Sequence, residues 1–141
     1  MPTGKELVVL ELTQDGKPYI YGYEVDLDDP DPEAFDCSEL EEWACWQLGV
    51  KPKFPDGSAN QLAYCRQHGT LIDIEKALIT PGALLFYQTE EHHHVATSQG
   101  NGKTIEARGK VYGVGQWDAR DRGWTHAALI PGLDYGEVQN G

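Results

Sequence analysis

Basic residues are scarce in this sequence. Lysine and arginine together number 11, against 23 aspartates and glutamates, and the formal net charge at pH 7 is −12. Proteins that bind nucleic acids neutralise phosphates with clustered lysines and arginines. No such cluster occurs along the chain, so nucleic acid is excluded as a partner.

Long apolar runs are also missing. The most apolar stretches, such as residues 83–87, are far shorter than the roughly 20 residues that a membrane-spanning helix needs. The first residues, MPTGKE, do not begin a secretory signal peptide. We therefore expect no membrane association and no secretion signal.

Cysteine is scarce as well, and the sequence shows no internal repeat or long linker. The chain has 3 cysteines, too few for a disulfide scaffold. Cys45 and Cys65 lie in helical patterns and are interpreted as small buried core residues. With 141 residues and 40% hydrophobic content, the chain can form one compact domain over 1–141.

Cys37 differs from the other two cysteines because it stands where a helix begins. Gly49 is the expected stop of this helix, and Ser38 with Glu41 has the spacing of a capping box, while Asp36 is an alternative N-cap. The apolar positions of the helix are Leu40, Trp43, Ala44 and Leu48. The positive end of a helix stabilises a thiolate and lowers a thiol pKa from about 8.5 to roughly 3.5–7.5. The sequence therefore predicts a reactive thiol at Cys37.

Residues 92–109 have the pattern of a β-hairpin, with two arms rich in β-branched residues around Gly100-Asn101-Gly102. A two-residue loop would put His94 and Glu106 on opposite faces. A three-residue loop, closed by Gly102 in the left-handed region, places His94 opposite Arg108 and diagonal to Glu106. Diagonal neighbours are about 7–8 Å apart at Cα, within reach of a glutamate and an imidazole. Cys37, His94 and Glu106 thus form a candidate nucleophile, base and orienting group.

At these residues the chain resembles the NlpC-type papain-like cysteine peptidases, which cleave peptidoglycan stem peptides. The resemblance extends from about Gly16 to Trp117. It rests on the segments Gly16-Lys17-Pro18-Tyr19-Ile20-Tyr21-Gly22, Phe35-Asp36-Cys37-Ser38, Gln61, Pro81-Gly82-Ala83-Leu84-Leu85-Phe86-Tyr87, His94-Val95-Ala96, Gly100-Asn101-Gly102 and Ile105-Glu106-Ala107.

The resemblance implies that Cys37 is the nucleophile, His94 the base and Glu106 the orienting residue. It also implies that substrate is bound beside the nucleophile by Tyr19, and that the free amino end of the stem peptide is bound by Asp36 and Ser38.

Three positions depart from the family pattern. Glu39 stands where glycine is usual and is expected to alter the specificity pocket, Ala83 replaces an aspartate, and Glu106 replaces a more usual histidine. A carboxylate holds an imidazole in one tautomer at least as well as a histidine does.

The resemblance implies a peptidoglycan hydrolase that cleaves between γ-D-glutamate and a diamino acid. The alternatives are a thiol amidase or acyltransferase on the same fold, or a catalytically silent module of a phage tail. The segments 104–109 and 130–135 resemble the branch carried by phages of actinobacteria. We expect a monomer located in the virion or host cytoplasm and released to the cell wall. Because the chain is acidic, retention on the wall would need a binding module or a larger phage protein.

No cofactor or metal is expected. Two residues of the triplet 92–94 could share a metal at most, because neighbours in a strand face opposite ways. Arg108 forms either a surface ion pair with Glu106 or a contact to a substrate carboxylate. The acidic run 24–33 is interpreted as a solvated loop, with a border of the cleft as the alternative.

The remaining pattern predicts an α+β, papain-like fold, with N-terminal helices packed on an antiparallel sheet. Helices are expected at 58–68 and 73–78, with Ser58 and Gln61 as a second capping box. Strands are expected near 84–88, 94–99, 104–108, 111–116 and 125–130. Residues 7–13 are ambiguous, since their branched side chains favour a strand and the family pattern favours a helix.

Overall fold

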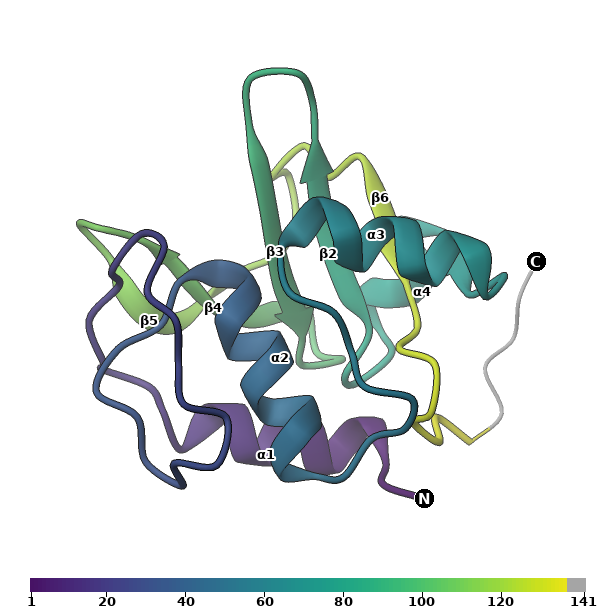
Figure 1. The fold of residues 1–141 in the computed structure, drawn as a ribbon. Coiled ribbons are helices and arrows are strands. Elements are labelled where there is room, and N and C mark those ends of the chain that lie inside the picture. Colours follow the sequence, from purple (N-terminus) through teal and green to yellow (C-terminus); the bar gives the residue numbers. More distant parts are fainter. Residues whose placement is uncertain (137–141) are drawn as a thin grey trace.

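The computed structural model describes residues 1–136 and shows helices packed on an antiparallel sheet (Figure 1). The helices are α1 (Gly4–Leu12), α2 (Cys37–Gln47), α3 (Ser58–Gln67) and α4 (Ile74–Leu78). The strands are β1 (Leu71–Ile72), β2 (Leu84–Gln88), β3 (His93–Ser98), β4 (Lys103–Gly109), β5 (Gly113–Asp118) and β6 (His126–Ala128). The predicted α+β class is confirmed.

One six-stranded sheet carries the site, with the strand order β1-β6-β2-β3-β4-β5. The β3–β4 pairing joins Thr97 to Ile105 and Ser98 to Thr104, which is the register expected from a three-residue loop. Gly102 has a φ of +83°, as the predicted bulge requires. The hairpin between β2 and β3 extends beyond the rest of the sheet (Figure 1).

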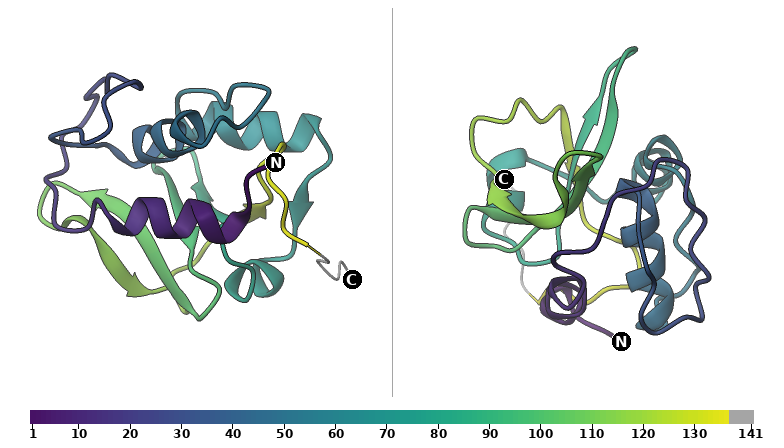
Figure 2. Two further views of the ribbon diagram at one scale, coloured as in Figure 1. Left: turned by 90° about the horizontal axis from the view of Figure 1, so that it is seen from below. Right: turned by 90° about the vertical axis from the view of Figure 1, so that its left-hand side faces the viewer.

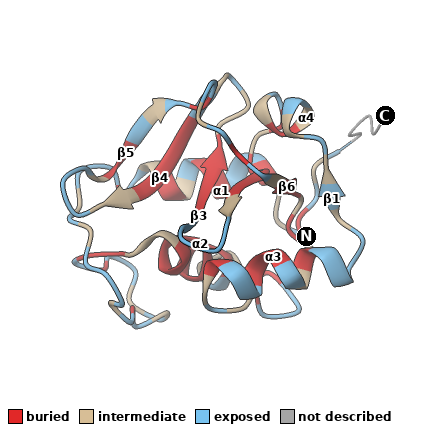
Figure 3. Ribbon diagram, turned by 90° about the horizontal axis from the view of Figure 1, so that it is seen from above, coloured by how far each residue is buried: buried red, intermediate tan, exposed pale blue. Residues whose placement is uncertain are grey.

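Because successive side chains of a strand point to opposite faces, the sheet has a core cluster on each of its two faces. Leu84 and Phe86 of β2 belong to the larger cluster, together with residues of α1, α2 and α3. Leu85 belongs to a smaller cluster that includes Ala77 of α4 and Trp124. Figure 2 shows α1 and α2 on the same side of the sheet, and Figure 3 shows buried residues concentrated in β3 and β4.

Two helix starts test the predicted caps. The alternative N-cap of α2, Asp36, is confirmed over Ser38, because its Oδ1 accepts a hydrogen bond from the Glu39 backbone N–H at 2.8 Å. The Ser58 and Gln61 capping box is wrong: Gly57 precedes α3 without a side-chain cap.

The ambiguous N-terminal segment is helix α1. Thr3 and Glu6 form a capping box that the sequence analysis missed, and Leu7 is fully buried in the larger core cluster. The local cap and the burial of one helical face together decide against a strand.

The strand predictions are confirmed in number and order after residue 84, with shifts of up to two residues at β5 and a shorter β6. The two-residue strand β1, which pairs with β6, was missed because so short a segment has no period of its own. The acidic run 24–33 is mainly an exposed loop, although Trp43 Nε1 donates to the Asp29 carbonyl at 2.7 Å. No described helix is both long and apolar enough to cross a membrane.

Candidate active site

Cys37 is the first residue of α2 and lies on a groove of about 730 Å³. The segment that leads into the helix is held in place by a bridge between Tyr19 and Phe35, and Phe35 is fully buried. The two residues before Cys37 therefore anchor the start of α2, Phe35 by its burial and Asp36 by its cap.

His94 and Glu106 meet as the hairpin register predicts. His94 Nε2 lies 2.8 Å from Glu106 Oε1, and both side chains are buried, with exposed fractions of 7% and 0%. Since a carboxylate only accepts hydrogen bonds, Nε2 carries the proton in this pair. The Nδ1 atom of His94 is then the nitrogen that can accept a proton.

Arg122, which no sequence pattern indicated, also binds Glu106. Its Nη2 and Nη1 atoms donate to Glu106 Oε1 and Oε2 at 2.8 and 3.1 Å. Thr104 Oγ1 also donates to Glu106 Oε2. Burial by itself would raise the pKa of Glu106, but hydrogen bonds from His94 and Arg122 outweigh it and lower this pKa to about 2. Glu106 is therefore an ionised carboxylate at neutral pH.

The position of Arg122 is itself supported. Its Nε donates to the Tyr87 hydroxyl at 3.2 Å, and its guanidinium lies 4.7 Å from the centroid of the Trp124 ring. Trp124 and Tyr87 stack on each other, with ring centroids 4.4 Å apart. The only sequence signal for this arrangement is indirect: a buried glutamate in place of histidine needs a counter-charge.

The predicted low pKa of Cys37 is wrong for this conformation. Burial raises the pKa of the Cys37 thiol to about 12, and the negative charges of Asp36 and Glu41 add to the shift. Hydrogen bonding with the backbone of Val95 and Ser38 acts in the opposite direction but is outweighed. Desolvation thus exceeds the stabilisation that the helix end supplies.

The thiol lies against the backbone of Val95, the residue that follows His94 in β3. No hydrogen bond joins the thiol to the His94 ring within residues 1–136. Catalytic hydrogen bonds are often long before substrate binds and become shorter in the complex. The structure thus brings His94 and Glu106 into direct contact and places Cys37 beside the same strand.

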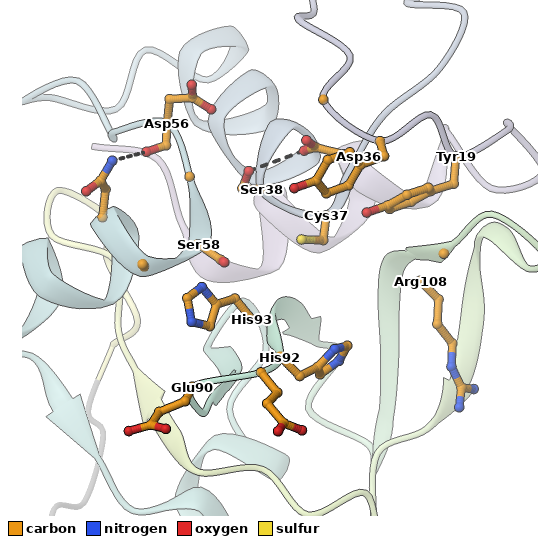
Figure 4. A pocket seen from close by; sticks show the side chains of 17 residues that line it. Tyr19, Asp36, Cys37, Ser38, Asp56, Ser58, Glu90, His92, His93 and Arg108 are labelled. Atoms are coloured by element: carbon orange, nitrogen blue, oxygen red, sulfur yellow. Dashed lines mark hydrogen bonds between the residues drawn. The ribbon is translucent and has the colours of Figure 1, made fainter.

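The groove contains the other residues that the resemblance implies. Figure 4 shows Cys37 between Tyr19 and Asp36 on one side and His93 on the other. Ser38 Oγ donates to Asp36 Oδ1 at 3.2 Å. Burial, followed by the nearby Cys37, raises the pKa of Tyr19 to about 12, so its hydroxyl remains protonated. Tyr19, Asp36 and Ser38 therefore share one wall with the thiol.

Arg108 does not pair with Glu106. Its guanidinium lies over the rings of Tyr112 and Trp117, at 4.7 and 5.2 Å from their centroids. The predicted ion pair is wrong, and Arg122 is the arginine that pairs with the carboxylate of Glu106. Arg108 instead lines the groove, as the alternative prediction requires.

Glu39 does not line the groove, so the expected change of the specificity pocket is not found. Its side chain is buried, and Oε2 accepts a hydrogen bond from the Val25 backbone N–H at 3.0 Å. Burial and a hydrogen bond with Asp56 raise the pKa of Glu39 to about 8. Glu39 thus ties the acidic loop to α2.

Glu39, Glu42 and Asp56 form a carboxylate cluster, with ligand atoms within 4.8 Å of one another. Lys53 Nζ lies 2.6 Å from Glu42 Oε2 and already supplies positive charge there. The histidine triplet belongs to no such cluster within the described part of the chain.

The sequence model of the NlpC/P60 family matches residues 16–131. Among curated protein sequences, none matches the chain significantly. The chain spans less than half the length of two of the solved structures it matches, NlpC1 and NlpC2 from Trichomonas vaginalis, of which it covers 44% and 46%.

Solved structures agree with the family match. The P60 domain of antigen MAP1204 from M. avium subspecies paratuberculosis is 27% identical with a TM-score of 0.74, and the match covers 94% of this chain and 96% of that domain. The peptidoglycan hydrolase RipB from Mycobacterium tuberculosis gives the same identity and TM-score over 94% of this chain and 65% of its own. NlpC2 is 26% identical over 93% of this chain, with a TM-score of 0.71. With a helix that begins at Cys37, a buried His94–Glu106 pair and a family match over most of its length, the chain belongs to the NlpC/P60 family and has its papain-like fold.

Proposed function

We propose that this domain is a cysteine endopeptidase that hydrolyses peptidoglycan stem peptides between γ-D-glutamate and a diamino acid. The observation that carries the proposal is the buried contact of 2.8 Å between His94 and Glu106, on the strand against which the Cys37 thiol lies. A nucleophile, a base and an orienting carboxylate are the three groups that such acyl transfer requires.

In the proposed reaction, His94 takes the thiol proton as the Cys37 sulfur attacks the scissile carbonyl carbon. Because burial keeps the thiol protonated, proton transfer accompanies the attack and does not precede it. Glu106 keeps the other ring nitrogen protonated and stabilises the imidazolium that forms. The backbone N–H of Cys37, at the start of α2, is a donor for the tetrahedral oxyanion.

Collapse of the tetrahedral intermediate breaks the C–N bond, and the imidazolium of His94 gives its proton to the departing amine. A water molecule, deprotonated by the same imidazole, then attacks the thioester and releases the carboxylic acid and the free thiol of Cys37. The chain's own residues thus suffice for both half-reactions.

The free amino end of the stem peptide is assigned to Asp36, Ser38 and Tyr19. The Asp36 carboxylate and the Tyr19 and Ser38 hydroxyls lie on the wall of the groove next to the thiol, where an ammonium would find several oxygen acceptors. The phage origin, implied by the resemblance, and the need for a wall-binding module, inferred from the acidic charge, remain predictions.

Mass spectrometry of wall digests tests the proposal. Purified peptidoglycan is incubated with the protein or with Cys37→Ala, and the soluble muropeptides are identified. We expect new amino-terminal diamino acids and free γ-carboxyl groups with the native protein only. Release of intact stem peptides from the glycan would indicate an amidase, and no products at all would favour the silent structural module.

A further inference from the structure

Two adjoining hollows of opposite charge surround the candidate catalytic residues. The larger groove is lined by four carboxylates, those of Asp36, Asp56, Glu90 and Glu91. A smaller hollow of about 330 Å³ is lined by Tyr87, His92, His94, Arg108, Tyr112 and Arg122. Within the described residues no carboxylate lines the smaller hollow, although the chain as a whole is strongly acidic.

His92 and Arg108 line both hollows, and Arg108 is the positively charged one of the two, with a guanidinium that is free to bind a ligand. It forms no ion pair with any carboxylate in residues 1–136. The rings of Tyr112 and Trp117 hold its guanidinium in place without using its N–H donors. An arginine fixed in this way presents a planar fork that matches a carboxylate.

The other polar groups of the smaller hollow favour the same ligand. Arg122 already donates to Glu106, and it also donates to the oxygen of the Tyr87 hydroxyl. The Tyr87 O–H proton is therefore directed to another acceptor, which a ligand in the hollow can supply. Figure 4 shows Arg108 on the side of Tyr19, across the groove from Asp56 and Glu90, where an anion would be repelled.

We propose that the smaller hollow is a subsite for the α-carboxylate of the glutamate whose γ-carbonyl is attacked. This inference rests on the proposed function. A γ-linked glutamate keeps its α-carboxylate free, and three carbons separate that group from the scissile carbonyl. The carboxylate can therefore reach a group to one side of the reacting bond, and Figure 4 shows Arg108 to one side of Cys37.

The subsite makes the domain selective between two chemical forms of the stem peptide. Amidation of the α-carboxylate removes the charge and replaces one acceptor oxygen by a donor, which faces the N–H groups of Arg108. A charge-assisted hydrogen bond lost in this way weakens binding by about 10- to 100-fold. The domain is thus specific for stem peptides with a free α-carboxylate.

Binding to Cys37→Ala protein tests the subsite independently of turnover. Isothermal titration calorimetry compares the peptide L-alanyl-γ-D-glutamyl-L-lysine with the same peptide in which the α-carboxylate of the glutamate is replaced by an amide. We expect the carboxylate form to bind about 10- to 100-fold more tightly. Adding Arg108→Met should abolish the difference, and Arg108→Lys should restore part of it. Arg66→Met removes an exposed arginine of α3 and should leave it unchanged.

Equal binding of the two peptides, or no binding of either, would overturn the subsite. So would a difference that survives Arg108→Met, once Arg108→Lys has shown that the hollow tolerates substitution. Selective binding combined with failure of the native protein to cleave the peptide would refute the proposed function and leave the subsite supported.

Discussion

Glu106 and Glu11 are both fully buried glutamates, but their surroundings differ. Glu106 accepts hydrogen bonds from His94, Arg122 and Thr104, and its pKa is lowered to about 2. Neither carboxyl oxygen of Glu11 has a hydrogen-bond donor of its own in the described part of the chain. Burial, followed by the charge of Glu41, raises the pKa of Glu11 well above its ordinary value.

The Glu11 side chain lies against the carboxyl group of Glu41, in the interface between α1 and α2. Glu41 in turn accepts from Thr97 Oγ1 at 2.7 and 2.8 Å. Two adjacent carboxyl groups share a hydrogen bond only if one of them holds a proton. Glu11 is therefore expected to be the protonated partner.

Equal burial thus accompanies pKa shifts of opposite direction, because neighbouring donors decide the outcome. To orient the proposed base, the buried carboxylate of Glu106 must stay charged, and its ion pair with Arg122 favours the charged form. Within residues 1–136 the Glu11–Glu41 pair has hydroxyl and carboxyl neighbours but forms no ion pair, and burial raises the pKa of both groups. The following predictions test this difference.

The largest effect is expected at His94, the histidine that contacts Glu106. His94→Ala removes the proposed base and should lower kcat/KM on a stem tripeptide by on the order of 10³–10⁶-fold. His93→Ala is the matched control, since His93 is exposed and pairs with no carboxylate in the part of the chain that the structure describes. Loss of activity in His93→Ala with retention in His94→Ala would show that the base had been assigned to the wrong residue.

Glu106→Gln separates the orienting role from the stabilising one. Turnover should fall by on the order of 10²–10⁴-fold because the imidazole loses its fixed tautomer. The guanidinium of Arg122, whose side chain is only 11% exposed, would lose its counter-charge. Removing one partner of a buried ion pair costs about 3–5 kcal/mol of unfolding free energy.

Adding Arg122→Met to Glu106→Gln should recover much of this unfolding free energy without recovering turnover. Urea denaturation and steady-state kinetics measure the two quantities. If Glu106→Gln alone kept near-normal turnover, another group would have to orient His94.

The two glutamates should also affect stability at opposite ends of the pH range. Glu106 has a folded pKa of about 2 against an ordinary 4.5, so its contribution is present above pH 4.5 and lost as the pH falls toward 2. That difference corresponds to on the order of 3 kcal/mol. Glu11 has a raised folded pKa, so its contribution is present below pH 4.5 and lost as the pH rises above it.

The midpoints of urea denaturation, measured between pH 3 and pH 9, test the predicted direction of both pH dependences. Glu106→Gln should flatten the acid side of the profile, and Glu11→Gln should flatten the neutral and alkaline side. A Glu11→Gln profile parallel to that of the native protein would show that Glu11 is ionised at neutral pH.

The smallest effect is expected at Cys37, whose thiol pKa is raised in part by the charge of Glu41. Iodoacetamide should label Cys37 before Cys45 and Cys65, which are 1% and 0% exposed. Because the pKa of Cys37 is raised to about 12, the labelling rate should keep rising through pH 9. Glu41→Gln removes one of the charges that raise this pKa and should speed labelling by about two- to fivefold. A plateau between pH 6 and 8 would instead indicate a thiolate paired with imidazolium.

Local sequence signals were enough for much of the fold. The glycine-rich loop of the β3–β4 hairpin set the register that brings His94 to Glu106, because the alternation of side chains leaves only one parity for a three-residue loop. Gly49 and Gly69 end α2 and α3 at positive φ, as their spacing predicted. Cys45 and Cys65 are buried, as their helical positions indicated.

Tertiary structure decided what local signals could not. Arg122 lies 16 residues beyond Glu106, and no local pattern shows that the loop before β6 returns to that carboxylate. Several polar residues near the starts of α2 and α3 have suitable spacing for a cap, and backbone geometry decided which of them, if any, caps each helix. The Cys37 thiol lies at a helix start, as the sequence determined, but its ionisation follows from burial and from charges on other elements. Turns and hairpin registers depend on residues that are close together in the sequence. Desolvation and counter-charges depend on which distant segments pack together.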